Sequence, residues 1–242
     1  MPVTDKASEV RAWYNSLYAS VGLSSTRPVE AYPQFLDLLN ARPGTSLLDV
    51  SCGQGFLLKA AQHRGVAALG VDISDQAVKL AHRVSPDSRV AVATGEALCF
   101  RDHSFDYVTC LGSLEHFLDM GEGLREMQRV AKPDALLCVM VPNSDFVGWR
   151  VLGRRGTAQQ DINEQLLSLD AWRRLFAEHN LQIVRILPDR WHAEKWRHGH
   201  ARGPLQRVKG MLLEAAWRAI PLRYEYQFIF LLRRRNTPPS GR

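Results

Sequence analysis

The sequence of 242 residues lacks any apolar run long enough to cross a membrane. Its longest apolar runs, ALLCVMV at 135–141 and FIFLL at 228–232, fall far short of the ~20 residues that a transmembrane helix needs. The first residues, MPVTDKASEVRAWYN, are charged and lack the apolar stretch of ~7 to 15 residues that a secretory signal contains. These absences predict a cytoplasmic protein without a membrane span.

Cysteine is scarce as well. The four cysteines stand singly, three of them in apolar, strand-like surroundings, and none forms a CxxC pair: Cys52, Cys99, Cys110 and Cys138. Isolated cysteines of this kind are usually buried, reduced thiols. His192, His198 and His200 do not stand at zinc-ligand spacing with any cysteine, and we interpret them as surface residues. No metal site is therefore predicted.

Most of the chain carries no net positive charge. Residues 190–242 carry 12 Lys or Arg against 3 Glu, a net charge of +9, whereas residues 1–189 carry 19 basic against 22 acidic residues, a net charge of −3. The overall charge of +6 therefore arises in the C-terminal region. A hydrophobic fraction of 45% is enough for one domain with a sizeable core, which argues against a disordered chain.

Apolar segments alternate with segments of helical periodicity, which is typical of an α/β fold with a parallel sheet. Helices are predicted within GFLLKAAQHRG, within SDQAVKLAHRV, which opens on the N-cap Ser74, and within DMGEGLREMQRVAKPD, which stops before Pro133. Five parallel strands are predicted, followed by two further strands: 46–51, 67–72, 89–93, 105–111, 135–141, 181–187 and 226–233.

A glycine-rich turn follows the first predicted strand, in LLDVSCGQGFLL. Gly53 and Gly55 allow a tight turn, so that a ligand can approach main-chain amides at a helix N-terminus. The dinucleotide fingerprint needs a third small residue for close helix packing, and that position holds Leu58. The turn therefore does not favour a nicotinamide or flavin cofactor.

Two acidic residues stand at the ends of the first two predicted strands. Asp49 can meet a positive ammonium group, directly or through water, and would repel a pyrophosphate. Asp72, 17 residues after Gly55, can accept both hydroxyls of a ribose. The set of acid, turn and second acid predicts a nucleoside ligand that carries an amino-acid arm.

Five segments resemble, in order, the motifs of class I S-adenosylmethionine-dependent methyltransferases of the type 11 group: LLDVSCGQG, GVDIS, ATGEALCF, SFDYVTCLGSLEHFLD and EMQRVAKPDALLCVMVPN. The resemblance covers about residues 44–143. It implies S-adenosyl-L-methionine as the cofactor. It also implies a Rossmann-like sheet of seven strands in the order 3-2-1-4-5-7-6, with strand 7 antiparallel and helices on both faces.

The resemblance further implies which residues bind the cofactor. Asp72 would hold the ribose, Ile73 would pack on the adenine, and the amide of Gly95 would serve the ring. Thr94 stands where many members have an Asp that meets the adenine amino group. The methionine arm would lie beside the first strand end and the glycine turn, and the full set is Asp49, Gly53, Gln54, Gly55, Asp72, Ile73, Thr94, Gly95, Leu111 and Gly112.

Methyl transfer is an in-line displacement, so the enzyme must align the acceptor and, for a hydroxyl, remove its proton. A similar LEH occurs in members that methylate hydroxyl oxygens, which makes His116 the first candidate base and Glu115 a second. A capping or packing role for His116 fits the sequence equally well. Asn143 lies either near the substrate or simply in a turn.

The predicted acceptor is a small molecule or a glycan or lipid precursor, methylated at oxygen. The Asn/Asp-Pro-Pro-Tyr motif, typical of enzymes that methylate exocyclic amines of bases, is missing after the fourth predicted strand, which ends in CLGSLEH. Two alternatives stay open: an RNA methyltransferase that uses the basic C-terminal region, and a cofactor-binding partner subunit without catalysis.

About 38 residues separate the last two predicted strands. They include DRWHAEKWRHGHARG and a helix predicted from Leu205 to Ile220, with one apolar and one charged face. That helix either packs on the sheet, covers the pocket, meets an anionic membrane surface or, less favoured, binds nucleic acid. Peripheral membrane attachment is thus an alternative location.

The predicted organisation has five parts. The N-terminal helix, with Trp13, Tyr14, Leu17 and Tyr18 on one face, either covers the cofactor or closes the edge of the sheet. The parts are an N-terminal helical lid, the cofactor-binding core, a basic insertion, the last core strand and a flexible tail: 1–43, 44–189, 190–225, 226–235 and 236–242.

Overall fold

The computed structural model describes residues 3–24, 27–149, 162–191 and 219–235. The tail 236–242 and most of the predicted helix from Leu205 to Ile220 lie outside these residues, as does most of the basic insertion. Within the described ranges, no helix is long and apolar enough to cross a membrane.

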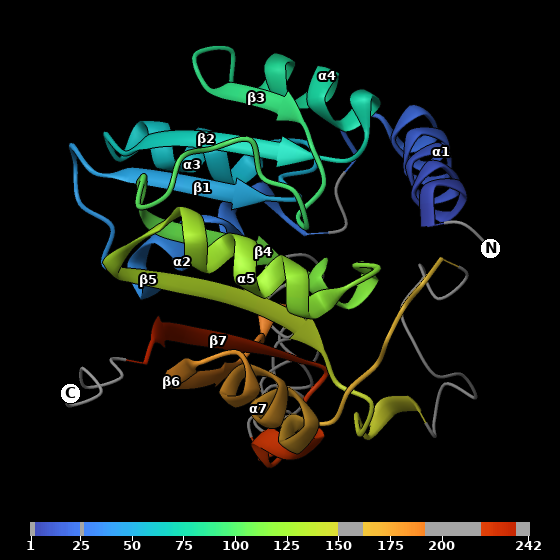
Figure 1. Cartoon of the computed structure of the whole chain (residues 1–242), viewed down its shortest axis with the longest axis vertical. Coiled ribbons are helices and arrows are strands. Elements are labelled where there is room, and N and C mark those ends of the chain that lie inside the picture. Colours follow the sequence, from blue (N-terminus) through green and yellow to red (C-terminus); the bar gives the residue numbers. More distant parts are fainter. Residues whose placement is uncertain (1–2, 25–26, 150–161, 192–218, 236–242) are drawn as a thin grey trace, which may run out of the picture.

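Seven strands form one sheet in the order β3-β2-β1-β4-β5-β7-β6, which confirms the predicted order (Figure 1). Strand β7 runs antiparallel to both of its neighbours, and the other pairs are parallel. The strands are β1 (Ser46–Val50), β2 (Ala67–Asp72), β3 (Arg89–Val92), β4 (Phe105–Leu111), β5 (Ala131–Pro142), β6 (Leu181–Pro188) and β7 (Gln227–Arg234).

Local sequence sets the helix boundaries. Ser74, Asp119 and Ser168 each accept a backbone N–H at the start of a helix, and Gly65, with φ of 73°, follows the end of α3. The helices are α1 (Val3–Val21), α2 (Pro33–Leu38), α3 (Phe56–His63), α4 (Asp75–Val84), α5 (Met120–Val130) and α7 (Leu169–Glu178), with the short 3₁₀ helices η1 (Val29–Ala31), η2 (Leu114–His116) and η3 (Leu222–Tyr224).

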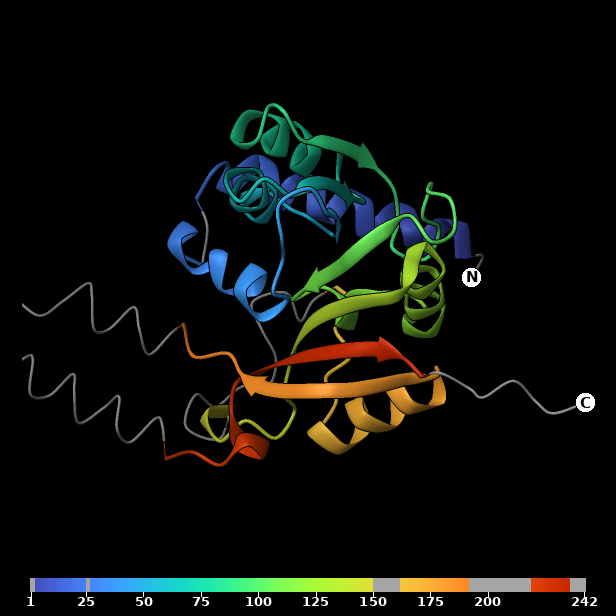
Figure 2. The same ribbon diagram turned by 90° about the vertical axis from the view of Figure 1, so that its left-hand side faces the viewer.

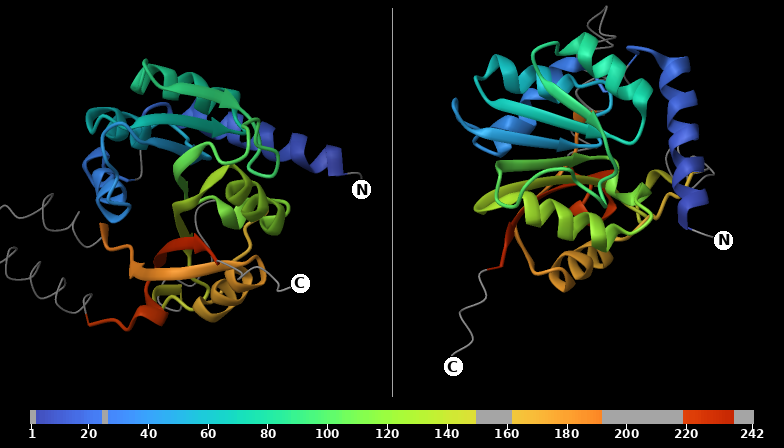
Figure 3. Two further views of the ribbon diagram at one scale, coloured as in Figure 1. Left: turned by 60° about the vertical axis from the view of Figure 1, so that its left-hand side comes forward. Right: turned by 45° about the horizontal axis from the view of Figure 1, so that its top comes forward.

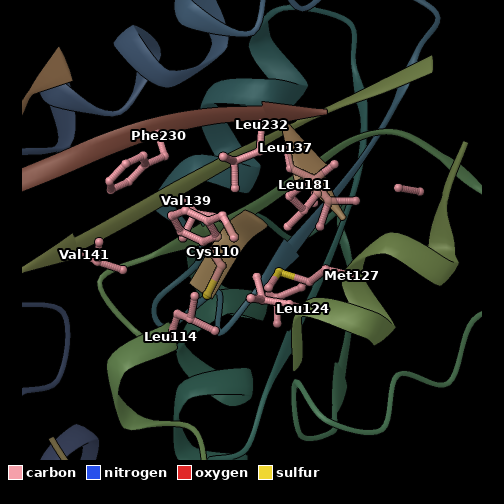
Figure 4. Packing of buried hydrophobic residues seen from close by; sticks show 14 of the residues in the cluster. Cys110, Leu114, Leu124, Met127, Leu137, Val139, Val141, Leu181, Phe230 and Leu232 are labelled. Carbon is pink, nitrogen blue, oxygen red and sulfur yellow. The ribbon is translucent and has the colours of Figure 1, made fainter. Parts of the chain in front are cut away.

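Helices cover both faces of the sheet (Figures 1 and 2). One hydrophobic cluster joins α5 and α7 to the sheet, and Figure 4 shows part of it, with side chains from β4, β5, β6, β7 and α5. A second cluster joins α2, α3 and α4 to the opposite face. Three of the four cysteines are buried and all four are free thiols, as the sequence predicts.

One predicted boundary was wrong. Strand β5 begins at Ala131 rather than at residue 135, so that Pro133 lies inside the strand. The pairing between β4 and β5 is irregular at this point, between Phe105 and Tyr107, and pairing with β7 begins only at Leu137. Because a proline lacks only the N–H donor, it is tolerated where the ladder is interrupted.

The parallel strands all end at one edge of the sheet, and this edge carries the predicted site. Helix α1 crosses it beside α4 (Figure 3). Ligands of open α/β sheets bind outside the carboxyl ends of the strands. The arrangement therefore places α1 over the region where the sequence predicts the cofactor.

Candidate active site

A pocket lies between α1 and the carboxyl ends of the strands. The predicted residues Asp72, Ile73, Thr94, Gly95 and His116 line it. Further lining residues come from α1 and from the loops that follow β1, β3 and β4: Ala7, Val10, Tyr14, Tyr18, Ser51, Ala93, Glu96, Ser113, Phe117 and Leu118. The fold thus brings together residues from four of the five motifs.

Asp72 is the central acidic group of the pocket. It ends β2 and is only 5% exposed. Its Oδ1 accepts the amide N–H of Ser74 and its Oδ2 that of Gly53, both at 2.9 Å. Burial raises the pKa of Asp72 to about 6, although these two amides lower it. At neutral pH the carboxylate is therefore ionised, and each oxygen keeps a lone pair for a further donor.

The glycine turn requires residues without a side chain at its end. Gly55 has φ of 77° and caps α3. A Cβ at Gly55 would lie 2.9 Å from the Cβ and 3.0 Å from the Cα of Ala81 in α4. Since backbone cannot yield as a flexible side chain can, any larger residue would separate α3 from α4. Gly53, with φ of 52°, lies against the phenol of Tyr18.

Asp49 is buried in β1 and does not line the pocket. Its Oδ1 accepts the hydroxyl of Thr109 at 2.6 Å. Burial raises the pKa of Asp49 to about 7, with a smaller contribution from the charge of Asp72, although the bond from Thr109 lowers it. The folded protein therefore holds a proton on Asp49 in a pH range where the unfolded chain has lost it.

This difference predicts a pH-dependent gain in stability for Asp49→Asn. Asp49 should contribute a decrease in the free energy of unfolding as pH rises from about 4 to about 7, and the variant should lack this contribution. At pH 8 we expect Asp49→Asn to be more stable by ~1 to 3 kcal/mol, because burial of an ionised carboxylate is removed and the amide oxygen can still accept from Thr109. Urea unfolding at pH 5 and pH 8 measures the effect.

Asp106→Asn provides a control of opposite sign. Although burial raises it, the pKa of Asp106 lies below its ordinary value because Lys132 and Ser46 bond to the carboxylate. This group stabilises the fold when ionised, so its replacement should reduce stability at pH 8. The interpretation of Asp49 is wrong if Asp49→Asn and the wild type show the same dependence on pH.

Two predicted cofactor residues, Gln54 and Gly112, bond to other parts of the chain. The amide of Gln54 donates to the carbonyl oxygens of Gly22 at 2.6 Å and Ser24 at 3.0 Å, in the segment that follows α1. The N–H of Gly112 donates to Met140 at 2.8 Å. Leu111 ends β4 and, like Gln54 and Gly112, is outside the pocket lining.

His116 closes the pocket at the end of η2. The ring is 6% exposed, and its Nδ1 lies 3.1 Å from the carbonyl oxygen of Ile162. A carbonyl only accepts, so Nδ1 carries the proton and donates, and Nε2 keeps its lone pair. Burial lowers the pKa of His116, although Ile162 and the charge of Glu164 raise it. The imidazole is therefore neutral at pH 7 and can accept a proton at Nε2.

Glu115 precedes His116 in the chain, and its carboxyl group lies close to the imidazole. It is 1% exposed, and its Oε1 lies 3.9 Å from Nε2 of His116. Among the described residues, Oε2 of Glu115 has no hydrogen-bond partner. Burial raises the pKa of Glu115 to about 8. This carboxyl group is thus mostly protonated at neutral pH, and it does not itself line the pocket.

Several lining residues escaped the prediction of the site. Phe117 lies so close to two glycines that a Cβ at Gly95 or Gly123 would come within 2.2 and 2.4 Å of its ring. Glu96 reaches the pocket and accepts the N–H of Leu118 at 2.9 Å. No local sequence pattern marks these two residues, because their contacts depend on how the loops after β3 and β4 pack together.

Asn143 has a structural role at the end of β5. It is fully buried, donates to the carbonyl oxygens of Arg223 and Glu225, and accepts the N–H of Asp145. These bonds agree with the turn interpretation of this residue.

Residues 48–139 match a family model that is described as a methyltransferase domain. Residues 48–139 form a type 11 methyltransferase domain. Domains of this type use S-adenosylmethionine as the cofactor, and the pocket fits it. The buried, ionised carboxylate of Asp72 at a strand end suits two ribose hydroxyls, and the glycine turn beside it leaves room for close approach to the backbone.

The methyltransferase domain has curated relatives. The chain is 37% identical over 106 residues to the ubiquinone biosynthesis O-methyltransferase of Hahella chejuensis, an alignment that covers 42% of this chain and 44% of the relative. The chain thus matches less than half the length of this relative.

Solved structures share the fold across nearly the whole chain. A chain of the complex between the Haloferax volcanii Trm112 methyltransferase activator and a methyltransferase aligns with a TM-score of 0.70 and 16% identity, covering 94% of this chain and 98% of that one. Geranyl diphosphate C-methyltransferase from Streptomyces coelicolor aligns with a TM-score of 0.67 and 14% identity, covering 97% and 99%. At these identities the likeness concerns the fold alone.

Proposed function

We propose that this protein transfers the methyl group of S-adenosylmethionine to a hydroxyl oxygen of a small molecule or of a glycan or lipid precursor. The observation that carries the proposal is the placement of His116 in the same pocket as Asp72, with Nδ1 tied to Ile162 and Nε2 left as a proton acceptor. The O-methyltransferase relative supports oxygen as the target atom.

In this proposal the core residues bind and orient the cofactor, which supplies a methyl group activated on a sulfonium sulfur. Asp72 accepts the two ribose hydroxyls, and Ile73 packs on the adenine. Thr94 and the amide of Gly95 meet the edge of the ring. The turn at Gly53 lets the backbone approach the methionine arm without a side chain in between.

His116 handles the proton of the acceptor. Nε2 takes the hydroxyl proton as the oxygen attacks, and Ile162 accepts from Nδ1 throughout, which keeps the ring in one tautomer. Oε1 of Glu115 lies 3.9 Å from Nε2, so the dipole of this protonated carboxyl group is close to the charged ring after the proton has moved, while burial keeps the pair uncharged beforehand.

The test is transfer of a labelled methyl group from S-adenosylmethionine to cell fractions separated into small molecules, glycans, lipids and RNA. The proposal expects O-methylated product in one of the first three fractions. Label in RNA would favour the RNA methyltransferase alternative. Saturable cofactor binding without transfer to any fraction would favour a non-catalytic partner subunit.

The RNA and membrane alternatives depend on the basic insertion, of which residues 192–218 lie outside the described part of the chain. The first two residues of this insertion, Arg190 and Trp191, lie in the described part of the chain and contact the core. Arg190 binds the carboxylate of Glu225 at 2.9 Å, and the ring of Trp191 packs on the guanidinium of Arg27. These contacts favour neither alternative over the proposed small-molecule, glycan or lipid acceptor.

A further inference from the structure

We infer that Tyr14 of α1 is a positioning residue for His116, so that the active site is complete only when α1 lies against the core. The inference rests on the proposed function, since it concerns the base of the same reaction. Helix α1 would then position the catalytic base in addition to lying over the pocket.

The first support is that polar contacts fix the register of α1 at the ribose end of the pocket. Nε of Arg11 donates to the carbonyl oxygen of Ile73 at 2.9 Å. The amide of Asn15 donates to Asp75 at 2.6 Å and accepts the hydroxyl of Ser74 at 2.6 Å. Because hydrogen bonds are directional, they set the rotation of the helix as well as its distance from α4.

A second anchor holds the far end of the helix. Gln54, inside the glycine turn, donates to the carbonyl oxygens of Gly22 and Ser24 just beyond α1. Helix α1 is therefore fixed at its middle and just beyond its C-terminal end by groups that neighbour the predicted cofactor residues Gly53 and Asp72.

This register directs one face of α1 into the pocket. Ala7, Val10, Tyr14 and Tyr18 line the pocket at spacings of three or four residues, which place them on one side of a helix. The phenol of Tyr18 lies at the glycine turn, where a Cβ on Gly53 would be 2.9 Å from it. Tyr14, one turn earlier, lies at His116.

The contact between Tyr14 and His116 has the geometry of an edge-to-face aromatic pair. Their ring centroids are 6.2 Å apart and their planes make an angle of 79°. The bond from Nδ1 to Ile162 holds one side of the imidazole, and Tyr14 packs against its ring. Together they restrict the orientation of the ring and keep the proton on Nδ1.

Tyr14 also keeps water from the imidazole. The acidic groups that face His116 are Glu115 of η2 and Glu164 of the loop that precedes α7. Burial lowers the pKa of His116, so removal of the Tyr14 ring should expose the imidazole and raise that pKa toward its ordinary value. The pKa of His116 can therefore be used to test the role of Tyr14 without an assay of methyl transfer.

The experiment compares Tyr14→Phe, Tyr14→Ala and Tyr224→Ala in the full chain. The imidazole resonance of His116, assigned with His116→Gln, is titrated by NMR, and kcat and cofactor affinity are measured in parallel. Tyr14→Ala should raise the His116 pKa and lower kcat by about 10- to 100-fold, the scale expected from a misplaced catalytic group. Tyr14→Phe keeps the ring and should retain both values. Tyr224, 41% exposed and outside the pocket, should change neither.

Asn15→Ala provides a second variant in case Tyr14→Ala fails to fold. It removes the bonds to Ser74 and Asp75 while leaving Tyr14 in place, and it should shift the His116 pKa in the same direction. The inference is overturned if Tyr14→Ala, or Asn15→Ala in its stead, leaves the His116 pKa and kcat at wild-type values. If the wild type methylates no acceptor, the proposed function fails, and the NMR titration still decides whether Tyr14 covers His116.

Discussion

Replacing His116 with alanine is expected to lower kcat by about 10²- to 10⁴-fold, the range typical of general-base removal. The affinity for S-adenosylmethionine should change little, because this substitution leaves intact the glycine turn and the Asp72 carboxylate that is proposed to bind the ribose. Single-turnover kinetics with an identified acceptor, together with titration calorimetry of the cofactor, separates these two effects.

The pH dependence of kcat gives a second measure of His116. Burial holds its pKa below the ordinary value of 6.5, so the imidazole stays unprotonated somewhat below that pH. In the wild type, kcat should stay constant as the pH decreases from neutral to below 6.5 and should decrease at lower pH. In His116→Ala, the residual kcat should not show this decrease.

Glu115→Gln is the matched control for His116. An amide is neutral like the protonated carboxyl group of Glu115, so this variant should bind cofactor normally and lose less activity than His116→Ala. A loss confined to thermal stability in His116→Ala, with kcat retained, would show that His116 only packs against Ile162 and Tyr14.

Replacing Asp72 with alanine is expected to weaken cofactor binding by ~2 to 4 kcal/mol, since two charge-assisted hydrogen bonds contribute about 1.5 to 3 kcal/mol each and partly compensate. This corresponds to a loss of about 30- to 1,000-fold in affinity. Titration calorimetry measures it directly, and the same titration with NAD should show no saturable binding.

Asp72 also stabilises the structure of the pocket itself, so a control variant is needed that keeps these internal bonds. Its oxygens accept the amides of Gly53 and Ser74, so alanine removes two internal bonds as well as the ligand contacts. Asp72→Asn keeps the shape and one acceptor oxygen, and it should separate loss of charge from loss of the turn. Wild-type affinity should fall below pH about 6, where the carboxyl group becomes protonated and donates instead of accepting. Unchanged affinity in both variants would contradict the assignment.

The sequence by itself determined most secondary structure and the nature of the cofactor site. Alternation of apolar and amphipathic segments located the seven strands, and Ser74 marked the start of α4. These signals are local, since a cap or a strand pattern depends on residues a few positions apart. The start of β5 was missed because no breaker separates it from α5, and only pairing with β4 converts Ala131 into a strand residue.

The tertiary structure decided which polar groups remain available for ligands. Gly112 and Gln54 fit the family pattern in sequence. In the structure, however, the backbone N–H of Gly112 donates to the carbonyl oxygen of Met140, and the side-chain amide of Gln54 donates to carbonyl oxygens in the segment after α1. The helical spacing of Tyr14 and Tyr18 showed that they share a face, but it did not show what that face covers. Asn15, which docks α1, bonds to Asp75, 60 positions further along the chain. Partners this distant in sequence are set by how strands and helices pack, and no local pattern records them.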